Sequence, residues 1–233
     1  MFTLHRAEDR FQTRTDWLDS RHAFSFAEHF DPARLGFGPL RVVNDDRIAP
    51  RSGFPPHAHR DMEILTWIVS GSLTHEDSEG HRITLGPGHA QRMRAGRGIV
   101  HSEMNLDATR PLHLLQIWIE PAQRGLVPGH EERLFTLAPG QVVVVASEDG
   151  AEGGLSIARD ARVLALRLER GDRHPLVLDP ARSAWLQVVQ GAGRIGTTAV
   201  AAGDALAVED ESGLEIEATA PLELLVFDLS PRA

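Results

Sequence analysis

The chain has 233 residues, a formal net charge of -9, and neither cysteine nor tyrosine. The lack of cysteine excludes disulfides, thiolate ligands and thiol nucleophiles, and the acidic balance argues against a nucleic-acid partner. Residues 1–14 are charged without an apolar signal core, and no apolar run approaches the roughly 18 residues that span a membrane. We therefore expect a cytoplasmic monomer that acts on a small molecule, away from membranes and nucleic acids.

Short predicted strands follow one another along the chain, separated by glycine and proline. Apolar runs typical of strands occur at residues 63–69, 113–119, 142–146, 163–168, 185–189 and 222–229. Turn signals between them include Ser70-Gly71, Gly86-Pro87-Gly88 and Gly191-Ala192-Gly193. Sustained helical periodicity is hard to find, so the pattern predicts an all-β protein built as a β-sandwich or barrel.

An internal repeat divides the chain into two copies. Residues 111–121 align without a gap on 221–231, and five of the eleven residues match. Two upstream matches, 67–71 with 185–191 and 87–90 with 202–205, keep the same order along the chain. We predict two copies of one β fold, with the N-terminal domain at residues 1–125 and the C-terminal domain at 126–233.

Two identically spaced pairs, His57-Ala58-His59 and His101-Ser102-Glu103, carry the candidate metal ligands. Side chains two apart on a strand point to the same face, roughly 7 Å from each other. If the two strands are neighbours, three imidazoles and one carboxylate meet at one point. That set suits a divalent transition metal and leaves one or two coordination positions open. We expect iron, with nickel, copper, manganese, zinc or cobalt as alternatives.

Glu63 is the alternative acidic ligand, because strand parity places it on the same face as His57 and His59. On an unbroken strand it lies about 13 Å beyond His59, although a turn at residues 60–62 shortens that distance. We favour Glu103 as the ligand. We expect Glu63 to lie outside the ligand set and to hydrogen-bond the imidazole of a ligand histidine.

The second copy has no equivalent ligand pairs. Positions offset by 110 to 120 residues hold Val177, Asp179 and the acidic stretch 211–217. We therefore expect one metal ion per chain and a C-terminal domain that binds none.

The other histidines and a nearby arginine cluster are expected to have structural or solvent roles. His75, His81 and His89 stand among charged and turn residues, which predicts solvent exposure. His113 lies in an apolar strand and is expected to be a partly buried structural residue. Three arginines between residues 92 and 97 are expected to form a solvated basic edge.

The ligand pairs and their surroundings resemble the two metal-binding motifs of the cupin superfamily. The first motif matches His57, His59, Glu63 and Gly71, and the second matches Gly96, Gly98, His101 and Asn105. More narrowly, the chain resembles the pirin family, and within it the bacterial pirin-like quercetin 2,3-dioxygenases. The stretches that carry this resemblance are residues 17–20, 22–26, 40–46, 59–66, 95–103 and 114–119. Ala58 departs from the pattern, because pirins commonly have proline there.

The resemblance implies a bicupin, with two tandem double-stranded β-helix (jelly-roll) barrels. It also implies metal ligation by His57, His59, His101 and Glu103, with Glu63 off the metal, and flavonol dioxygenase activity. In that reaction Glu103 or Glu63 accepts the proton of the flavonol 3-hydroxyl, and dioxygen opens the ring with release of carbon monoxide.

Three functions are therefore open. The leading hypothesis is the flavonol dioxygenase, and the main alternative is a metal-binding regulatory or redox-sensing protein without turnover. A third possibility is an isomerase or decarboxylase acting on a small sugar or acid. Four apolar residues are expected to line the pocket, on one strand parity or the other, and suit a flat aromatic ligand better, namely Leu65, Trp67, Leu115 and Ile117.

Overall fold

The computed structural model describes residues 1–230, so the last three residues of the predicted C-terminal domain lie outside the described part. The all-β prediction is confirmed, because strands dominate these residues and the helices there are two short 3-10 turns, η1 (Ala7–Asp9) and η2 (Ala151–Gly153). None of the helices within residues 1–230 has the length and apolar character required to cross a membrane.

The chain folds into two compact units. The N-terminal unit comprises Phe11–Phe135 and Leu155–Arg159, and the C-terminal unit comprises Met1–Arg10, Thr136–Gly154 and the chain from Asp160 onward. This division differs from the expected boundary after residue 125 at two points. Strand β1 (Phe2–His5) pairs with β20 (Ala205–Val208), and β12 (Gly129–Leu134) pairs with β9 (His89–Arg94). Strand pairing therefore assigns the first residues to the C-terminal unit and extends the N-terminal unit past residue 125.

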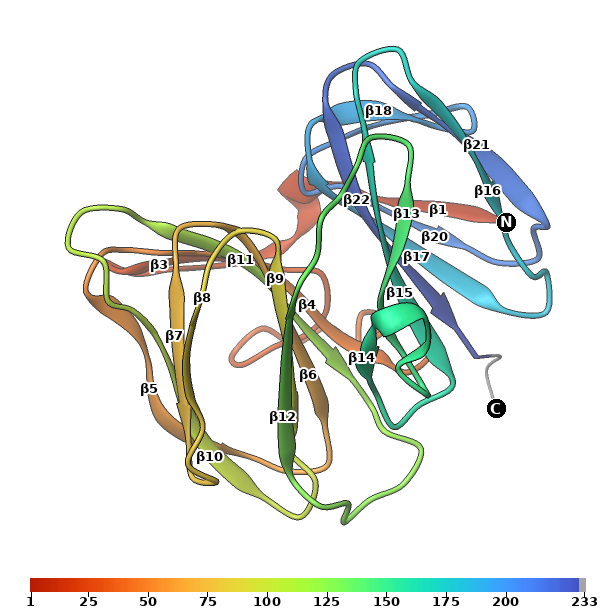
Figure 1. The fold of residues 1–233 in the computed structure, drawn as a ribbon. Helices are drawn as coiled ribbons and strands as arrows, with labels where there is room; N and C mark the ends of the chain where they lie inside the picture. Colours follow the sequence, from red (N-terminus) through yellow and green to blue (C-terminus); the bar gives the residue numbers. More distant parts are fainter. Residues whose placement is uncertain (231–233) are drawn as a thin grey trace. The chain divides into compact units, whose positions relative to one another are not determined.

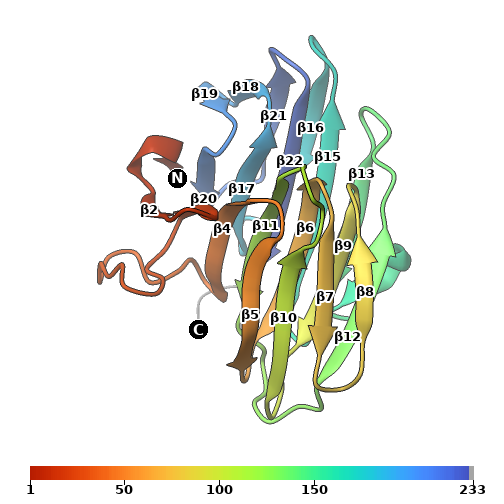
Figure 2. The same ribbon diagram turned by 90° about the vertical axis from the view of Figure 1, so that its left-hand side faces the viewer.

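Two antiparallel sheets form the N-terminal unit (Figure 1). The larger has the order β12-β9-β6-β11-β4-β3-β2, and its further strands are β2 (Phe11–Arg14), β3 (Leu18–His22), β4 (Leu40–Ile48), β6 (Glu63–Ser70) and β11 (Leu112–Ile119). The smaller has the order β5-β10-β7-β8, with β5 (Ser52–His59), β7 (Leu73–Asp77), β8 (Arg82–Leu85) and β10 (Ile99–Asn105). Figure 2 shows the four strands of this smaller sheet side by side.

The C-terminal unit repeats this plan. Its larger sheet has the order β1-β20-β17-β22-β15-β13, and the strands not yet named are β13 (Val142–Ser147), β15 (Ala161–Leu168), β17 (Ser183–Gln190) and β22 (Leu222–Leu229). Its smaller sheet has the order β16-β21-β18-β19, with β16 (Arg173–Val177), β18 (Ala192–Ile195), β19 (Thr198–Ala201) and β21 (Gly213–Ala218). The short strand β14 (Leu155–Ser156) lies in the segment that belongs to the N-terminal unit.

The predicted repeat corresponds to equivalent strands in the two units. Strand β11 lies between β4 and β6, and β22 lies between β15 and β17, so the two aligned segments occupy the same place in their sheets. The turns after β6 and β17 are also alike, since Gly71 and Gly191 have φ of +81° and +82°. A Cβ on Gly71 would meet the carbonyl oxygen of Pro111 at 2.5 Å, and one on Gly191 would approach that of Pro221 still more closely. Both copies therefore require glycine at this position.

The interior of the N-terminal unit is apolar at one end and polar at the other. Seven buried side chains form the apolar end, namely Leu18, Ile48, Ile68, Leu73, Leu85, Leu112 and Leu114. Because alternate residues of a strand share a face, Gln116 and Trp118 follow Leu114 on the inner face of β11. The polar end of the interior is where the predicted ligands lie.

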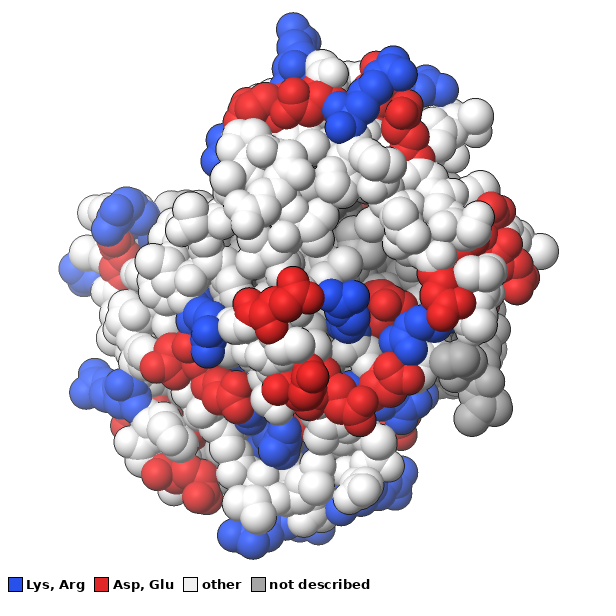
Figure 3. All heavy atoms as spheres, turned by 45° about the vertical axis from the view of Figure 1, so that its right-hand side comes forward, with Lys and Arg blue, Asp and Glu red and all other residues white. Residues whose placement is uncertain are grey.

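Charged side chains of both signs share the surface drawn in Figure 3, where acidic groups form a band. Some pair across strands, as Arg173 of β16 does with Glu215 and Glu217 of β21, at 3.3 and 3.2 Å. This mixing of charge is typical of a solvated surface.

Candidate metal centre

The two predicted ligand pairs lie on neighbouring strands of the smaller sheet. Strands β5 and β10 are antiparallel, and their register places His101 opposite His57. The ring centroids of His57, His59 and His101 are 4.5 to 4.9 Å apart, and the Nε2 atoms of His57 and His101 are separated by 3.1 Å. One ligand nitrogen from each ring lies within 4.8 Å of the others. The structure thus brings the three histidines to one point.

The protonation states of these histidines suit metal binding. The Nδ1–H of His57 donates to the carbonyl of Pro55 at 2.8 Å, which leaves the lone pair on Nε2 directed toward His101. Burial, together with the neighbouring His57 ring, lowers the pKa of His59 to about 4 and that of His101 to about 2. Neutral imidazoles with converging lone pairs are the form in which histidine binds a transition metal. The residues present therefore fit such an ion.

Glu103 is buried at the same end of the interior, and its carboxylate is held by side chains of the larger sheet. It accepts hydrogen bonds from Gln116 at 2.6 Å, Gln91 at 2.9 Å and Thr66 at 3.3 Å. Burial nevertheless raises the pKa of Glu103 to about 7, since the three neutral donors offset only part of the desolvation. A carboxylate oxygen of Glu103 lies within 4.8 Å of a His101 ring nitrogen. The carboxylate is fixed in position and has no cationic partner among these contacts.

The expected contact between Glu63 and a ligand imidazole is wrong. Glu63 is fully buried, and its carboxylate accepts hydrogen bonds from Arg94 at 2.7 Å and from the backbone N–H of Ala158 at 3.2 Å. The turn at residues 60–62, with Asp61 at φ +51°, ends β5 and resets the strand parity. Thr66 faces the interior, so Glu63, three residues earlier on β6, faces the opposite side of the sheet.

Arg92 also differs from its expected place on a solvated edge. Its side chain is only 3% exposed and forms ion pairs with Glu131 and, at 3.8 Å, with Glu63. Arg94 is half-buried and pairs with Glu63, whereas Arg97 is exposed as expected. These arginines compensate the charge of a buried carboxylate, which explains why two of the three leave solvent.

His75 is another departure, because it is completely buried rather than exposed. Its Nδ1 lies 3.4 Å from Nδ1 of His101, and its Nε2 lies 3.3 Å from Asp77. Asp77 also contacts His81 at 2.9 Å, and His130 stacks on His75 with ring centroids 4.7 Å apart. His75 and Asp77 stand two residues apart on β7, so they repeat the spacing of the ligand pairs. The two-residue spacing was the sequence signal for this pair, but the charged residues around it favoured a prediction of solvent exposure.

The predictions for the remaining histidines agree with the structure in part. His81 has a side chain 43% exposed, in accord with its expected solvent position, while His89 is half-buried. His113 is 15% exposed and contacts Asp45 at 2.8 Å, so its expected partial burial is confirmed.

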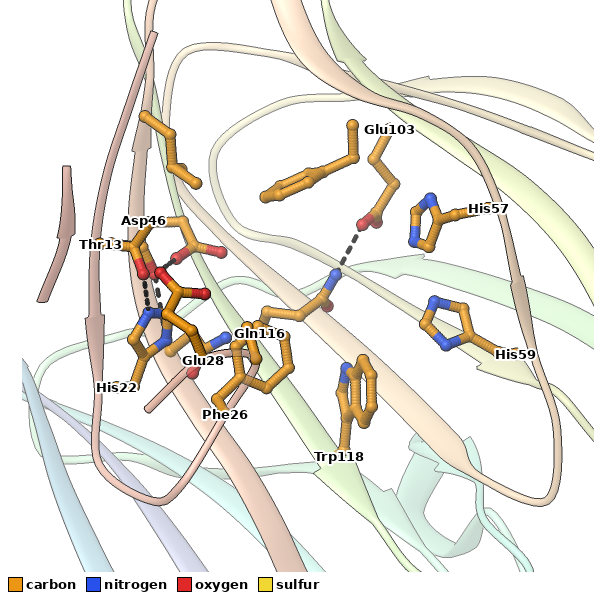
Figure 4. A pocket seen from close by; sticks show the side chains of 15 residues that line it. Thr13, His22, Phe26, Glu28, Asp46, His57, His59, Glu103, Gln116 and Trp118 are labelled. Carbon is orange, nitrogen blue, oxygen red and sulfur yellow. Dashed lines mark hydrogen bonds between the residues drawn. The ribbon is translucent and has the colours of Figure 1, made fainter. Parts of the chain in front are cut away.

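A cavity of about 280 Å³ opens beside the candidate ligands. Figure 4 shows His57, His59 and Glu103 on one side of it, with Phe26 and Trp118 as aromatic walls. The four apolar liners expected from the sequence are wrong, because Leu65, Trp67, Leu115 and Ile117 lie on the opposite face of their strands. Gln116 and Trp118 of the other parity line the cavity instead.

The family models identify both units. The Pirin model matches residues 4–119, and the model of the quercetinase C-terminal cupin domain matches residues 144–229. The quercetin 2,3-dioxygenase of Escherichia coli K12 is 40% identical over 231 residues, which cover 99% of this chain and 100% of that protein.

Solved structures agree with these matches. The crystal structure of YhhW from Escherichia coli has a TM-score of 0.96 and 40% identity, and covers 99% of this chain and 98% of its own. The bacterial pirin YhhW in complex with nickel(II) has a TM-score of 0.95 at 39% identity, covering 99% and 100%. With such a relative matched over its whole length, this chain belongs to the pirin family of bicupins.

Proposed function

We propose that this protein is a metal-dependent dioxygenase that opens the heterocyclic ring of a flavonol such as quercetin, with release of carbon monoxide. The observation that carries the proposal is the placement of three imidazoles and a fixed carboxylate beside a cavity with aromatic walls. The names of the relatives support the activity, and the nickel(II) complex of the related pirin supports metal binding.

His57, His59, His101 and Glu103 would hold the metal. Iron remains the first candidate from the donor set, and nickel joins it because of the related complex. A metal bound there supplies Lewis acidity, which lowers the pKa of a hydroxyl oxygen next to it.

The protein side chains would perform the other tasks. Glu103 would accept the proton of the flavonol 3-hydroxyl, because it is the carboxylate that lies beside both the three histidines and the cavity. Gln116, Gln91 and Thr66 hold its two oxygens for that transfer. Phe26 and Trp118 would hold the flat rings of the substrate and exclude water. Glu63 is an unsuitable base, because it faces the other side of its sheet.

The test is aerobic turnover of quercetin by protein loaded separately with iron, nickel, copper, manganese, cobalt or zinc. We expect loss of quercetin absorbance together with release of carbon monoxide for at least one metal, and no turnover above background for His101→Ala. The matched control is His174→Ala, which removes a half-buried histidine of the C-terminal unit and should keep full activity. If His101→Ala turns over quercetin as fast as the unaltered protein, the dioxygenase proposal fails.

A metal-binding regulatory or redox-sensing protein is the second candidate function. Within residues 1–230, every group of three or more histidine or acidic ligand atoms closer than 4.8 Å lies in the N-terminal unit. The C-terminal unit therefore repeats the fold without repeating these groups, which leaves its surface available for a partner. A stoichiometric protein partner, combined with no flavonol turnover under any metal, would favour this function.

A further inference from the structure

The cavity beside the candidate ligands has a second polar end that the proposed reaction does not use. Figure 4 shows Asp46, His22 and Thr13 gathered on the side opposite His57 and His59. Ser20 and Asn44 line the cavity with them. All but Thr13 are at most 3% exposed, so this polar group is built into the interior rather than placed on the surface.

Strand register sets the distance between the two ends. His22 of β3 pairs with Asn44 of β4, and Asn44 pairs with Gln116 of β11, so the three side chains form one row across the larger sheet. Gln116 is the residue that donates to Glu103. Neighbouring strands are about 4.8 Å apart, so His22 lies roughly 10 Å from Gln116. A molecule of two or three linked aromatic rings has about this length.

The hydrogen bonds at the second end are incomplete. The Ser20 hydroxyl donates to Oδ1 of Asp46, but within residues 1–230 the Oδ2 atom of Asp46 and the side-chain amide of Asn44 have no hydrogen-bond partner. Burial raises the pKa of Asp46 to about 7, because Ser20 offsets only part of the desolvation. Asp46 and Asn44 both line the cavity, so a ligand hydroxyl there can donate to the free oxygen of Asp46 or bond to the amide of Asn44.

The other members of the group are held in place. His22 contacts the hydroxyl of Thr13 at 2.9 Å and that of Ser20 at 3.3 Å, and its ring stacks on Phe26 with centroids 5.1 Å apart. These contacts hold the His22 ring in place, so it forms one side of the second polar end of the cavity. The groups left to meet a ligand are therefore the carboxylate of Asp46 and the amide of Asn44.

We propose that this end is the binding site for a hydroxylated aromatic ring, remote from the reacting group of the substrate. Asp46 accepts a hydrogen bond from a phenolic hydroxyl there, and Asn44 bonds a second hydroxyl. Phe26, Phe54 and Trp118 line the cavity and hold the planar rings between its ends. The inference rests on the proposed flavonol activity and adds which flavonols the site prefers.

The test compares flavonols that share the 3-hydroxychromone group but differ on the pendant phenyl ring. Quercetin has two hydroxyls on that ring and galangin has none. Their Kd values are measured by quenching of tryptophan fluorescence in metal-loaded protein under argon, where dioxygen cannot support turnover. At pH 8, where Asp46 with its pKa of about 7 is mostly ionised, we expect quercetin to bind about tenfold more tightly than galangin, as one hydrogen bond to a charged group allows.

Two substitutions locate the preference. Asp46→Asn keeps the shape of the side chain but removes its charge and replaces one of the two acceptor oxygens with an NH₂ donor, and should make the two Kd values nearly equal by weakening quercetin alone. Asn44→Ala should reduce the preference in the same way without changing a charge. The matched control is Asp45→Asn, which changes the adjacent carboxylate, bonded to His113 and Arg47, and should keep the tenfold preference.

The outcomes separate this inference from the proposed function. Equal binding of quercetin and galangin by the unaltered protein, or a preference that survives both Asp46→Asn and Asn44→Ala, overturns the inference while turnover of either flavonol upholds the dioxygenase. No binding and no turnover of any flavonol overturns both.

Discussion

Glu103 and Glu63 are both buried carboxylates, yet their partners give them different tasks. Glu103→Gln removes a negative charge from the proposed metal site and should raise the metal Kd by more than about tenfold. Glu63→Gln breaks the pairs with Arg94 and Arg92 and should cost roughly 3 kcal/mol of unfolding free energy, with little effect on the metal Kd. Competition titrations with a chelator and urea unfolding of both variants measure these effects. Greater metal loss in Glu63→Gln would mean that the two roles are reversed.

The raised pKa of Glu103 also predicts how metal binding depends on pH. Without metal the group is mostly protonated at pH 6, because its pKa is about 7, and it must lose that proton to bind a cation. His59 and His101 are already neutral at that pH, since their pKa values are about 4 and about 2. Metal affinity should therefore rise with pH up to about 7 through the ionisation of Glu103.

Calorimetry in two buffers of different ionisation enthalpy counts the protons released. At pH 6 the unaltered protein should release about one proton more per metal ion than Glu103→Gln does. An equal release from both proteins would show that Glu103 gives up no proton to the metal.

At the scale of elements, strand β7 places a hydrogen-bonded chain behind the candidate ligand His101. When His101 binds through Nε2, its Nδ1–H can donate to His75, whose Nε2–H donates to Asp77. Such outer contacts orient a ligand imidazole, so His75→Ala should weaken metal binding about 10- to 100-fold. His81→Ala removes only the exposed partner of Asp77 and should have a much smaller effect. Urea unfolding of the metal-free variants separates a positioning effect from a loss of fold.

The turn after β6 gives a prediction about stability alone. Gly71→Ala places a Cβ 2.5 Å from the Pro111 carbonyl at φ +81°, so both steric overlap and backbone strain oppose it. Gly80→Ala shares the strain, at φ +92°, but meets nothing within 4 Å. Gly80→Ala should cost about 1 kcal/mol and Gly71→Ala clearly more than that. Urea unfolding measures both, and an equal cost would show that the approach to Pro111 is unimportant.

At the scale of the whole molecule, the sequence was most informative where a pattern stays within one element. The spacing of His57 and His59 needs only strand periodicity, and the repeat needs only an alignment. The sequence does not show on which face a side chain lies after a turn, because one extra residue in the turn moves every following side chain to the opposite face of the sheet. That is why Glu63 was assigned to the wrong face. The burial of His75 depends on β7 pairing with β10, which no local pattern encodes.

The two-copy architecture leads to a prediction of stoichiometry, about one transition-metal ion per chain. The N-terminal unit gathers three imidazoles and a carboxylate, whereas the places of these ligands in the C-terminal copy hold side chains such as Val177 and Asp179. Arg173 lies between Glu215 and Glu217 on the neighbouring strand, so those carboxylates already have a cationic partner. Carboxylates alone would also favour calcium or magnesium, which need several oxygens from a dedicated loop. Metal analysis of reconstituted protein measures the ratio, and the doubly substituted His57→Ala/His101→Ala protein should retain no ion. A second tightly held ion that survives this double substitution would show that the C-terminal unit is a metal site in its own right.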